Sequence, residues 1–392
     1  MSGAVLLSGA VIFDGESWHH NHSLLVRGGA VEIVPEDSSP QSDIDAIRLE
    51  GGILAPGFVD MQVNGGGGVM LNDQRDVSAI RTICCAHARF GTTALLATLI
   101  TDTPAITAEA VAAGIEATEA QTPGFLGLHL EGPHLSIARK GAHDPDLIRP
   151  MNAEDLARLI DARRHLPVLL CTIAPESVTP DQVAALAAAR VIVSLGHSDC
   201  TAAQAHLYAG AGVTVTTHLF NAMSQMGNRE PGLVGATLDE GRLSCGLIAD
   251  GFHVDPTTIR VAMRGKQAPG RICLVTDAMA TIGTDMTSFT LNGRTIRRQG
   301  GRLTLADGTL AGADLDMISA VRFMHETIGI SLEDALKMAS TYPAQALGVG
   351  ASHGRLGAGS RADIVHLSPD LNVQHVWISG KSVYAASSGG PL

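Results

Sequence analysis

The chain has 392 residues, a formal net charge of -12 at pH 7 and a hydrophobic content of 45%, which allows one large domain and one small domain. The acidic balance and the lack of a Lys and Arg cluster exclude nucleic acid and anionic membranes as expected partners, because both attract clustered positive charge. The six cysteines follow no metal-finger or disulfide spacing. Because the N-terminus also lacks a basic start and no apolar run is long enough to span a membrane, we expect a cytoplasmic protein.

The two ends of the chain have the same pattern of short alternating strands. At the N-terminus these strands are predicted at 5–12, 23–26 and 30–33, separated by glycine and aspartate turns. Near the C-terminus they are predicted at 362–367 and 376–383. We therefore expect one small β-sandwich domain formed by residues 1–54 and 359–392, beside a larger domain of residues 55–358.

Between the two ends, apolar runs rich in β-branched residues alternate with Ala-rich segments of helical period. This alternation is typical of βα units around a buried parallel sheet. The predicted strands are 53–60, 92–99, 125–131, 168–173, 191–197, 213–218, 245–250 and 272–277, and the predicted helices include 77–89, 104–120, 153–166, 180–190 and 201–209. Eight such units predict an α/β fold, a (β/α)8 TIM-type barrel.

Glu131, His197, His218 and Asp277, whose side chains can bind metals or protons, each end one of the predicted strands. A single Glu or His in this position is more often a satisfied polar group, so the hypothesis depends on all four together. Active sites of such barrels lie at the C-terminal ends of the strands, where these side chains should meet. One carboxylate and two neutral imidazoles suit a divalent ion such as Zn²⁺ and leave a position for water, whose proton Asp277 is placed to take.

Loops that follow two of these strands carry further candidate groups. His143 lies in the loop after the Glu131 strand, where it either donates to a developing oxyanion or lies in an ordinary surface turn. The segment 217–223 places backbone amides beside His218, where they suit an anion. Arg229 is suited to bidentate phosphate contact, and an ordinary solvated arginine is the alternative.

Six motifs occur in one order along nearly the whole chain. They are Pro-Gly-Phe-Val-Asp at 56–60, His-Leu-Glu-Gly-Pro at 129–133, Gly-His-Ser at 196–198, Thr-His-Leu-Phe-Asn-Ala-Met at 217–223, Asp-Gly-Phe-His-Val-Asp at 250–255 and Val-Thr-Asp-Ala at 275–278. In these motifs the chain resembles the amidohydrolase superfamily and, within it, the N-acetylglucosamine-6-phosphate deacetylase family.

The resemblance implies metal-dependent hydrolysis of N-acetyl-D-glucosamine 6-phosphate to D-glucosamine 6-phosphate and acetate. It implies that Glu131, His197 and His218 bind one divalent ion per subunit, with zinc as the first choice and iron, cobalt or manganese as alternatives. It makes Asp277 the acid and base, and places His143 near the acetyl carbonyl. The implied substrate contacts are Ala142, His143, Asn221, Ala222, Arg229, His253, Leu310, Ala311 and Gly312. It also implies a homodimer in which Arg229 reaches the partner's site.

One departure from the wider superfamily concerns the first barrel strand, where many members carry a His-x-His pair that holds a second metal. Here the pair is Gln62 and Asn64, and neutral amides bind zinc poorly beside imidazoles. The chain is therefore expected to hold one metal, with these two residues as the remnant of a second site. Three alternatives stay open: N-acetylgalactosamine 6-phosphate as substrate, a cyclic-amide hydrolase of the dihydroorotase kind, and a catalytically silent barrel used for assembly.

Overall fold

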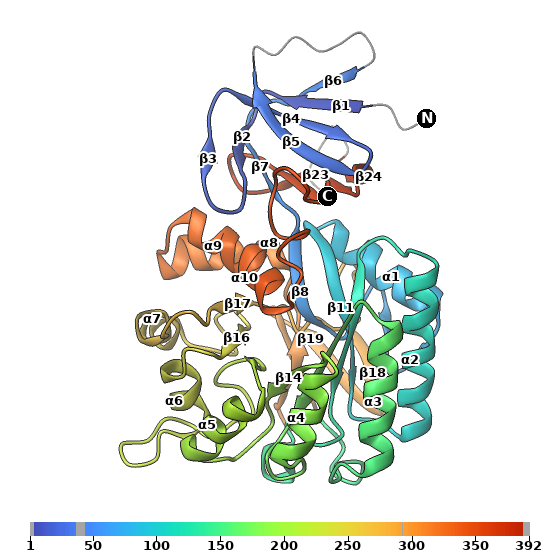
Figure 1. The fold of residues 1–392 in the computed structure, drawn as a ribbon, viewed down its shortest axis with the longest axis vertical. Coiled ribbons are helices and arrows are strands. Elements are labelled where there is room, and N and C mark those ends of the chain that lie inside the picture. The colour runs from blue at the N-terminus through green and yellow to red at the C-terminus, as the bar shows by residue number, and fades with distance from the viewer. Residues whose placement is uncertain (1–3, 37–43, 292, 387–392) are drawn as a thin grey trace.

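The computed structural model describes residues 4–36, 44–291 and 293–386, and a barrel of parallel strands forms its centre (Figure 1). The strands form one sheet in the order β17-β16-β15-β14-β13-β12-β11-β8. Their bounds are β8 (Phe58–Val63), β11 (Thr92–Ile100), β12 (Phe125–Glu131), β13 (Val168–Ile173), β14 (Ile192–Leu195), β15 (Val215–Thr216), β16 (Ser244–Leu247) and β17 (Ile272–Leu274). The sheet closes after β17, where the Asp277 amide donates to the Gln62 carbonyl at 3.0 Å. The predicted (β/α)8 barrel is confirmed.

Helices cover the outside of the barrel (Figure 1). They are α1 (Val77–Ala88), α2 (Pro104–Glu119), α3 (Ala153–His165), α4 (Pro180–Ala188), α5 (Ala202–Ala211), α6 (Gly232–Asp239), α7 (Pro256–Gly265), α8 (Met317–Arg322), α9 (Leu332–Ala339) and α10 (Thr341–Ala346), with a 3₁₀ turn at Ile137–Arg139 and a π-helical turn at Phe323–Ile328. The first five begin after capping side chains that accept a backbone N–H of the first turn, namely Asp76, Thr103, Asn152, Thr179 and Thr201. All five lie where the sequence predicts them. None of the helices in the described ranges is both long and apolar enough to cross a membrane.

Strands from both ends of the chain form two sheets beside the barrel (Figure 1). The first has the order β5-β4-β1-β6 and the second the order β24-β23-β22-β7-β2-β3. The bounds are β1 (Ala4–Ser8), β2 (Val11–Phe13), β3 (Trp18–His19), β4 (His22–Arg27), β5 (Ala30–Pro35), β6 (Ile44–Arg48), β7 (Ile53–Pro56), β22 (Ile364–Leu367), β23 (Val373–Ile378) and β24 (Lys381–Ala385). Buried side chains from both sheets, such as Leu24 and Trp377, share one cluster. The small β structure made by both termini is confirmed, whereas its borders at 54 and 359 stay a prediction, and residues 1–3, 37–43 and 387–392 lie outside the described ranges.

The predicted strand 53–60 is wrong as a single element, because the chain changes sheets within it. β7 pairs with strands of the terminal sheet, and β8 begins the barrel and continues past Asp60 to Val63. Gly57 joins the two, and a Cβ atom at this position would lie 2.1 Å from Oγ1 of Thr93. A glycine is therefore required where the barrel meets the terminal sheet.

An antiparallel sheet between β17 and α8 is absent from the sequence prediction. Its strands are β18 (Ser288–Leu291), β19 (Arg294–Gln299), β20 (Arg302–Thr304) and β21 (Leu310–Ala313), and a short hairpin of β9 (Gly65–Gly66) and β10 (Val69–Met70) lies nearby. Phe289, Leu291 and Ile296 pack in one buried cluster with Met70 and Ile100. The inserted sheet is thereby fixed over the end of the barrel where β11 stops.

Candidate metal centre and active site

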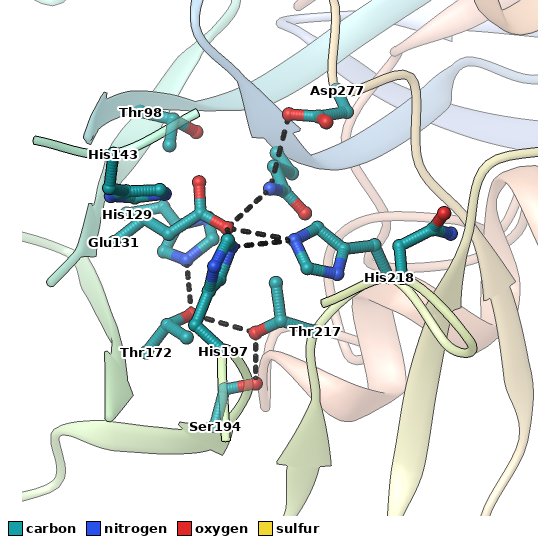
Figure 2. Close-up of polar contacts among 12 residues, drawn as sticks. Thr98, His129, Glu131, His143, Thr172, Ser194, His197, Thr217, His218 and Asp277 are labelled. Atoms are coloured by element: carbon teal, nitrogen blue, oxygen red, sulfur yellow. Dashed lines mark hydrogen bonds and ion pairs between the residues drawn. The ribbon is translucent and has the colours of Figure 1, made fainter. Parts of the chain in front are cut away.

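The three predicted metal ligands meet at one point at the C-terminal end of the barrel (Figure 2). Glu131 is the last residue of β12, and His197 and His218 follow the ends of β14 and β15. Oε1 of Glu131 lies 3.3 Å from Nε2 of His197 and 3.1 Å from Nε2 of His218, and the two Nε2 atoms are 3.1 Å apart. All three side chains are buried. The sequence prediction that these residues converge is therefore met by the geometry.

The backbone turns sharply where these side chains enter the site. His197, His218 and Asp277 have φ angles of 47°, 28° and 50°, in the left-handed region that costs a residue with a Cβ atom about 1–2 kcal/mol. Each turn comes just after a barrel strand ends, which shortens β15 and β17 relative to the predicted strands 213–218 and 272–277. Strain of this kind persists only where the surrounding structure enforces it, and here it aims three functional groups into one space.

The protonation of the cluster can be read from its hydrogen bonds. Nδ1 of His197 donates to the Arg139 carbonyl at 2.9 Å, which leaves a lone pair on Nε2, facing the Glu131 carboxylate. Burial alone would raise the pKa of Glu131, but the hydrogen bonds and charges that His197 and His218 supply when protonated outweigh it and lower that pKa well below its usual range. Neutral rings, which metal ligation requires, do not supply that charge. An ionised carboxylate and an imidazole lone pair 3.3 Å apart need positive charge between them.

This donor set fits a divalent cation. Carboxylate oxygen and imidazole nitrogen are ligands of zinc and of similar divalent ions. Nδ1 of His218 is buried and has no hydrogen-bond partner within the described residues, so the ring is held only through its Nε2 side. A nitrogen of His143 also lies within 4.8 Å of the ligand atoms of Glu131 and His197.

Asp277 lies beside the cluster and is bound by two amide side chains. Its Oδ1 accepts from Nδ2 of Asn64 at 2.6 Å and from Nε2 of Gln62 at 3.2 Å, and the same Gln62 nitrogen donates to Glu131 at 3.0 Å. Burial, followed by the negative charge of Glu131, raises the pKa of Asp277 to about 6. Gln62 therefore donates N–H groups to both carboxylates, and Asn64 donates to Asp277 alone.

His143 presents an N–H group to the same space. The Thr101 amide donates to Nδ1 of His143 at 3.3 Å, and the Thr101 hydroxyl lies 2.8 Å from the same atom. Burial, followed by the charge of His197, lowers the pKa of His143 well below its usual range, so the ring is neutral. Because Nδ1 is the acceptor, the proton lies on Nε2, and His143 can donate one hydrogen bond.

A cavity of about 160 Å³ opens onto these groups. Seven of the nine predicted substrate contacts line it: Ala142, His143, Asn221, Ala222, His253, Leu310 and Gly312. Ala311 is fully buried on the other side of β21, because successive side chains of a strand point to opposite faces. Arg229 is exposed in the loop before α6 and does not line the cavity of its own subunit. His253 is oriented by Asp250, whose Oδ2 lies 2.6 Å from its Nδ1.

Several residues at the site were missed in the sequence. The apolar lining comprises Ile100, Ile248, Met279 and Leu291, and in the sequence these residues cannot be distinguished from ordinary core. Arg294 of the inserted sheet donates to the Ala142 carbonyl, which ties this sheet to the His143 loop. The alternating pattern of 288–291 and 294–299 and the glycine pair at 300–301 were the available signals for that sheet.

The two imidazoles next to Glu131 in sequence do not join the cluster. Nε2 of His129 lies 2.7 Å from Oγ1 of Thr172 inside the barrel, where threonine and serine hydroxyls continue the network (Figure 2). Nδ1 of His134 lies 3.0 Å from the Arg149 carbonyl on the outer side. Proximity in sequence to Glu131 thus does not make either residue a ligand.

Comparison with known proteins places the chain among enzymes of one chemistry. The sequence profile of the Amidohydrolase family matches residues 53–383. The chain is 42% identical to N-acetylgalactosamine-6-phosphate deacetylase of Shewanella sp. (strain ANA-3), over 86% of this chain and 85% of that protein. The crystal structure of N-acetylglucosamine-6-phosphate deacetylase from Pasteurella multocida has 34% identity and a TM-score of 0.93, covering 98% of this chain and 100% of that chain. A mutant N-acetyl-D-glucosamine-6-phosphate deacetylase from Mycobacterium smegmatis in complex with N-acetyl-D-glucosamine-6-phosphate has 31% identity and a TM-score of 0.89, with coverages of 98% and 100%.

Proposed function

The chain belongs to the amidohydrolase family, and we propose that it removes the acetyl group of N-acetyl-D-glucosamine 6-phosphate, giving acetate and D-glucosamine 6-phosphate. Relatives of nearly full coverage are named for this activity. The observation that carries the proposal is the cluster of Glu131, His197 and His218, whose facing atoms lie within 3.3 Å of one another beside the buried Asp277. The bond is proposed to be a linear amide because the relatives are named as deacetylases of N-acetylated amino sugars.

The proposed cofactor is one divalent ion per subunit, held by Glu131, His197 and His218, with zinc as the first choice. When bound, such an ion polarises a carbonyl and acidifies water. Gln62 and Asn64 support a single ion, because neutral amides are poor ligands beside imidazoles and their N–H groups already donate to Glu131 and Asp277. Metal analysis of the purified protein tests both the number and the identity of the ions.

The remaining chemistry belongs to the side chains of the chain. Asp277 takes a proton from the attacking water as a C–O bond forms at the acetyl carbon, and returns it to the sugar nitrogen as the C–N bond breaks. Its pKa of about 6 lies near neutral pH, so one carboxylate can act first as base and then as acid. The N–H at Nε2 of His143 stabilises the negative charge that develops on the acetyl oxygen.

The relatives differ in the sugar for which they are named, which is a glucosamine or its hydroxyl epimer galactosamine. N-acetylgalactosamine 6-phosphate is the second candidate substrate, because a relative named for that substrate is 42% identical to this chain. The side chains of Asn221 and His253 line the cavity and can bind sugar hydroxyls. Comparison of kcat/KM for the two 6-phosphates decides between them, since a ratio of kcat/KM values measures the preference of an enzyme.

We also propose a homodimer in which Arg229 binds the phosphate in the partner's site. The support is that Arg229 is exposed and does not line the cavity of its own subunit, although the resemblance assigns it to phosphate. An Arg229→Ala variant is expected to raise KM for the phosphorylated sugar at least tenfold with little change in kcat. Light scattering of the same variant tests the dimer separately.

We propose a cytoplasmic location, supported by six free cysteines, five of which are buried. Localisation of a tagged copy in cells tests it.

The test of the proposed function is acetate release from N-acetylated hexosamine 6-phosphates and from the sugars without phosphate. We expect acetate from a 6-phosphate and at least a hundredfold lower kcat/KM without the phosphate. A protein that is loaded with metal and releases acetate from none of these compounds would contradict the proposal and favour the silent assembly role.

A further inference from the structure

A second hollow lies at the end of the barrel opposite the metal centre. It has a volume of about 640 Å³, larger than the cavity at the metal centre. Residues where barrel strands begin, such as Val168, Ile192 and Ser244, line one side, and residues of α10 with the turn after it line the other. The metal centre lies where the same strands end, so the two hollows are separated by the length of the barrel.

The polar lining of this hollow is dominated by four arginines, Arg163, Arg190, Arg242 and Arg271, which we call the arginine basin. No Asp or Glu is among the described residues that line it. Arg242 is neutralised by Glu240, whose Oε2 lies 2.6 Å away. The other three have no ion pair among the described residues, which is notable in a chain of net charge -12.

Two of these arginines are linked by a hydrogen bond from the Arg163 side chain to the Arg190 backbone. Nε of Arg163 donates to the Arg190 carbonyl at 2.8 Å, and its Nη1 donates to the Leu166 carbonyl at 2.8 Å, which leaves Nη2 free of these bonds. Burial, followed by the positive charge of Arg190, lowers the pKa of Arg163. Both guanidiniums belong to residues that line the basin, and an anion bound there would offset their like charges.

Arg190 also has an unfavourable backbone conformation. It follows the end of α4 with a φ of 64°, a position after a helix where glycine is usual. A side chain with a Cβ atom costs free energy there. Ten non-glycine residues of the described ranges share this backbone region, His197, His218 and Asp277 among them. A glycine at 190 would therefore relieve strain while it removes the guanidinium.

The third free arginine is held by packing. The guanidinium carbon of Arg271 lies 5.2 Å from the centre of the Tyr342 ring on α10. Stacking on an aromatic ring limits the rotation of a guanidinium but leaves its N–H edge available. The Arg271 backbone amide donates to the Ser244 hydroxyl at 3.2 Å, which fixes the start of β17 at the rim.

We propose that the arginine basin binds a small phosphorylated molecule, with the phosphate held by the guanidiniums of Arg163, Arg190 and Arg271. Planar guanidiniums match phosphate oxygens two at a time, and several of them together favour a dianion over a single carboxylate. A volume of about 640 Å³ holds a whole metabolite rather than a bare anion. The site lies at the opposite end of the barrel from the metal centre and is independent of the proposed catalysis.

The test is calorimetric titration of inorganic phosphate into the metal-loaded protein at low ionic strength, comparing matched variants. Arg190→Gly removes the guanidinium at a position that favours glycine, so the melting temperature should stay equal or rise. We expect this variant to weaken one phosphate-binding event at least tenfold. Arg164→Ala is the control, because Arg164 neighbours Arg163 on α3 but pairs with Asp161 outside the basin. Its affinity for phosphate should stay within twofold of the wild type.

Two further variants separate this site from the catalytic one. Arg271→Ala should weaken the same event, which keeps the test valid if Arg190→Gly proves unstable. Arg229→Ala, which alters the proposed substrate contact, should leave that event unchanged. Equal binding by Arg190→Gly, Arg271→Ala and the Arg164→Ala control would overturn the proposal. Binding of polyglutamate without binding of phosphate would also overturn the proposal, because the arginine basin would then be a protein-docking surface.

Discussion

Replacement of Asp277 by asparagine removes the group that transfers the proton and keeps the hydrogen bonds that hold the side chain in place. Oδ1 of Asp277 accepts from Asn64 and Gln62, and the amide oxygen of an asparagine can accept both bonds. Burial, followed by the negative charge of Glu131, raises the pKa of Asp277, so loss of the Asp277 charge also removes a repulsion between two carboxylates. We therefore expect the Asp277→Asn variant to fold with an unchanged or higher melting temperature and to retain its metal.

The expected loss is one of rate. General acid–base catalysis contributes about 10²- to 10⁴-fold, so kcat/KM for the 6-phosphate substrate should fall by roughly 10³-fold, equivalent to ~4 kcal/mol. The assay is acetate release under kcat/KM conditions, with metal analysis and a melting curve of the same preparation. Asp363→Asn is the matched control, because Asp363 is also a buried carboxylate but lies beside β22, where it pairs with Arg361, and its kcat/KM should fall less than tenfold. An Asp277→Asn variant within tenfold of the wild type would refute the assignment of Asp277.

Three other outcomes follow from the same geometry. Asp277 must be ionised to act as base, and its pKa is raised to about 6, so kcat/KM should fall as the pH drops. The midpoint should lie at or below 6, because a bound cation favours the ionised form. A midpoint above 7 would contradict this assignment. His143→Gln should lower kcat by about 10²-fold with little change in KM, whereas a change in KM alone would point to substrate binding. Chelation of the metal should lower the melting temperature, because a ligand of the folded state stabilises it, and added zinc should restore it; an unchanged melting curve would argue against the site.

Much of the fold could be predicted because each element has a local cause. α3, α4 and α5 begin at Asn152, Thr179 and Thr201, whose side chains cap them. The buried strands are apolar on both faces, which is the pattern of a parallel sheet covered by helices. The split at Gly57 could not be read in the same way, because it arises from contact with Thr93, far along the chain.

The site was predictable in its polar residues and not in its apolar ones. Glu131 and His218 stand out in sequence because each ends an apolar run. Met279 and Leu291 do not, since a cavity lining and a core use the same residue types. The role of Gln62 also needed coordinates, because only the structure shows one amide nitrogen between Glu131 and Asp277.

Metal content of ligand variants shows whether Glu131, His197 and His218 hold an ion. The wild-type protein should hold one equivalent of divalent ion per chain, and His218→Ala should hold much less after dialysis. His134→Asn is the control, because His134 is also buried and lies near Glu131 in sequence but faces the Arg149 carbonyl, and it should keep the full equivalent. A His218→Ala protein that is folded and retains one equivalent of metal would show that His218 is not a ligand.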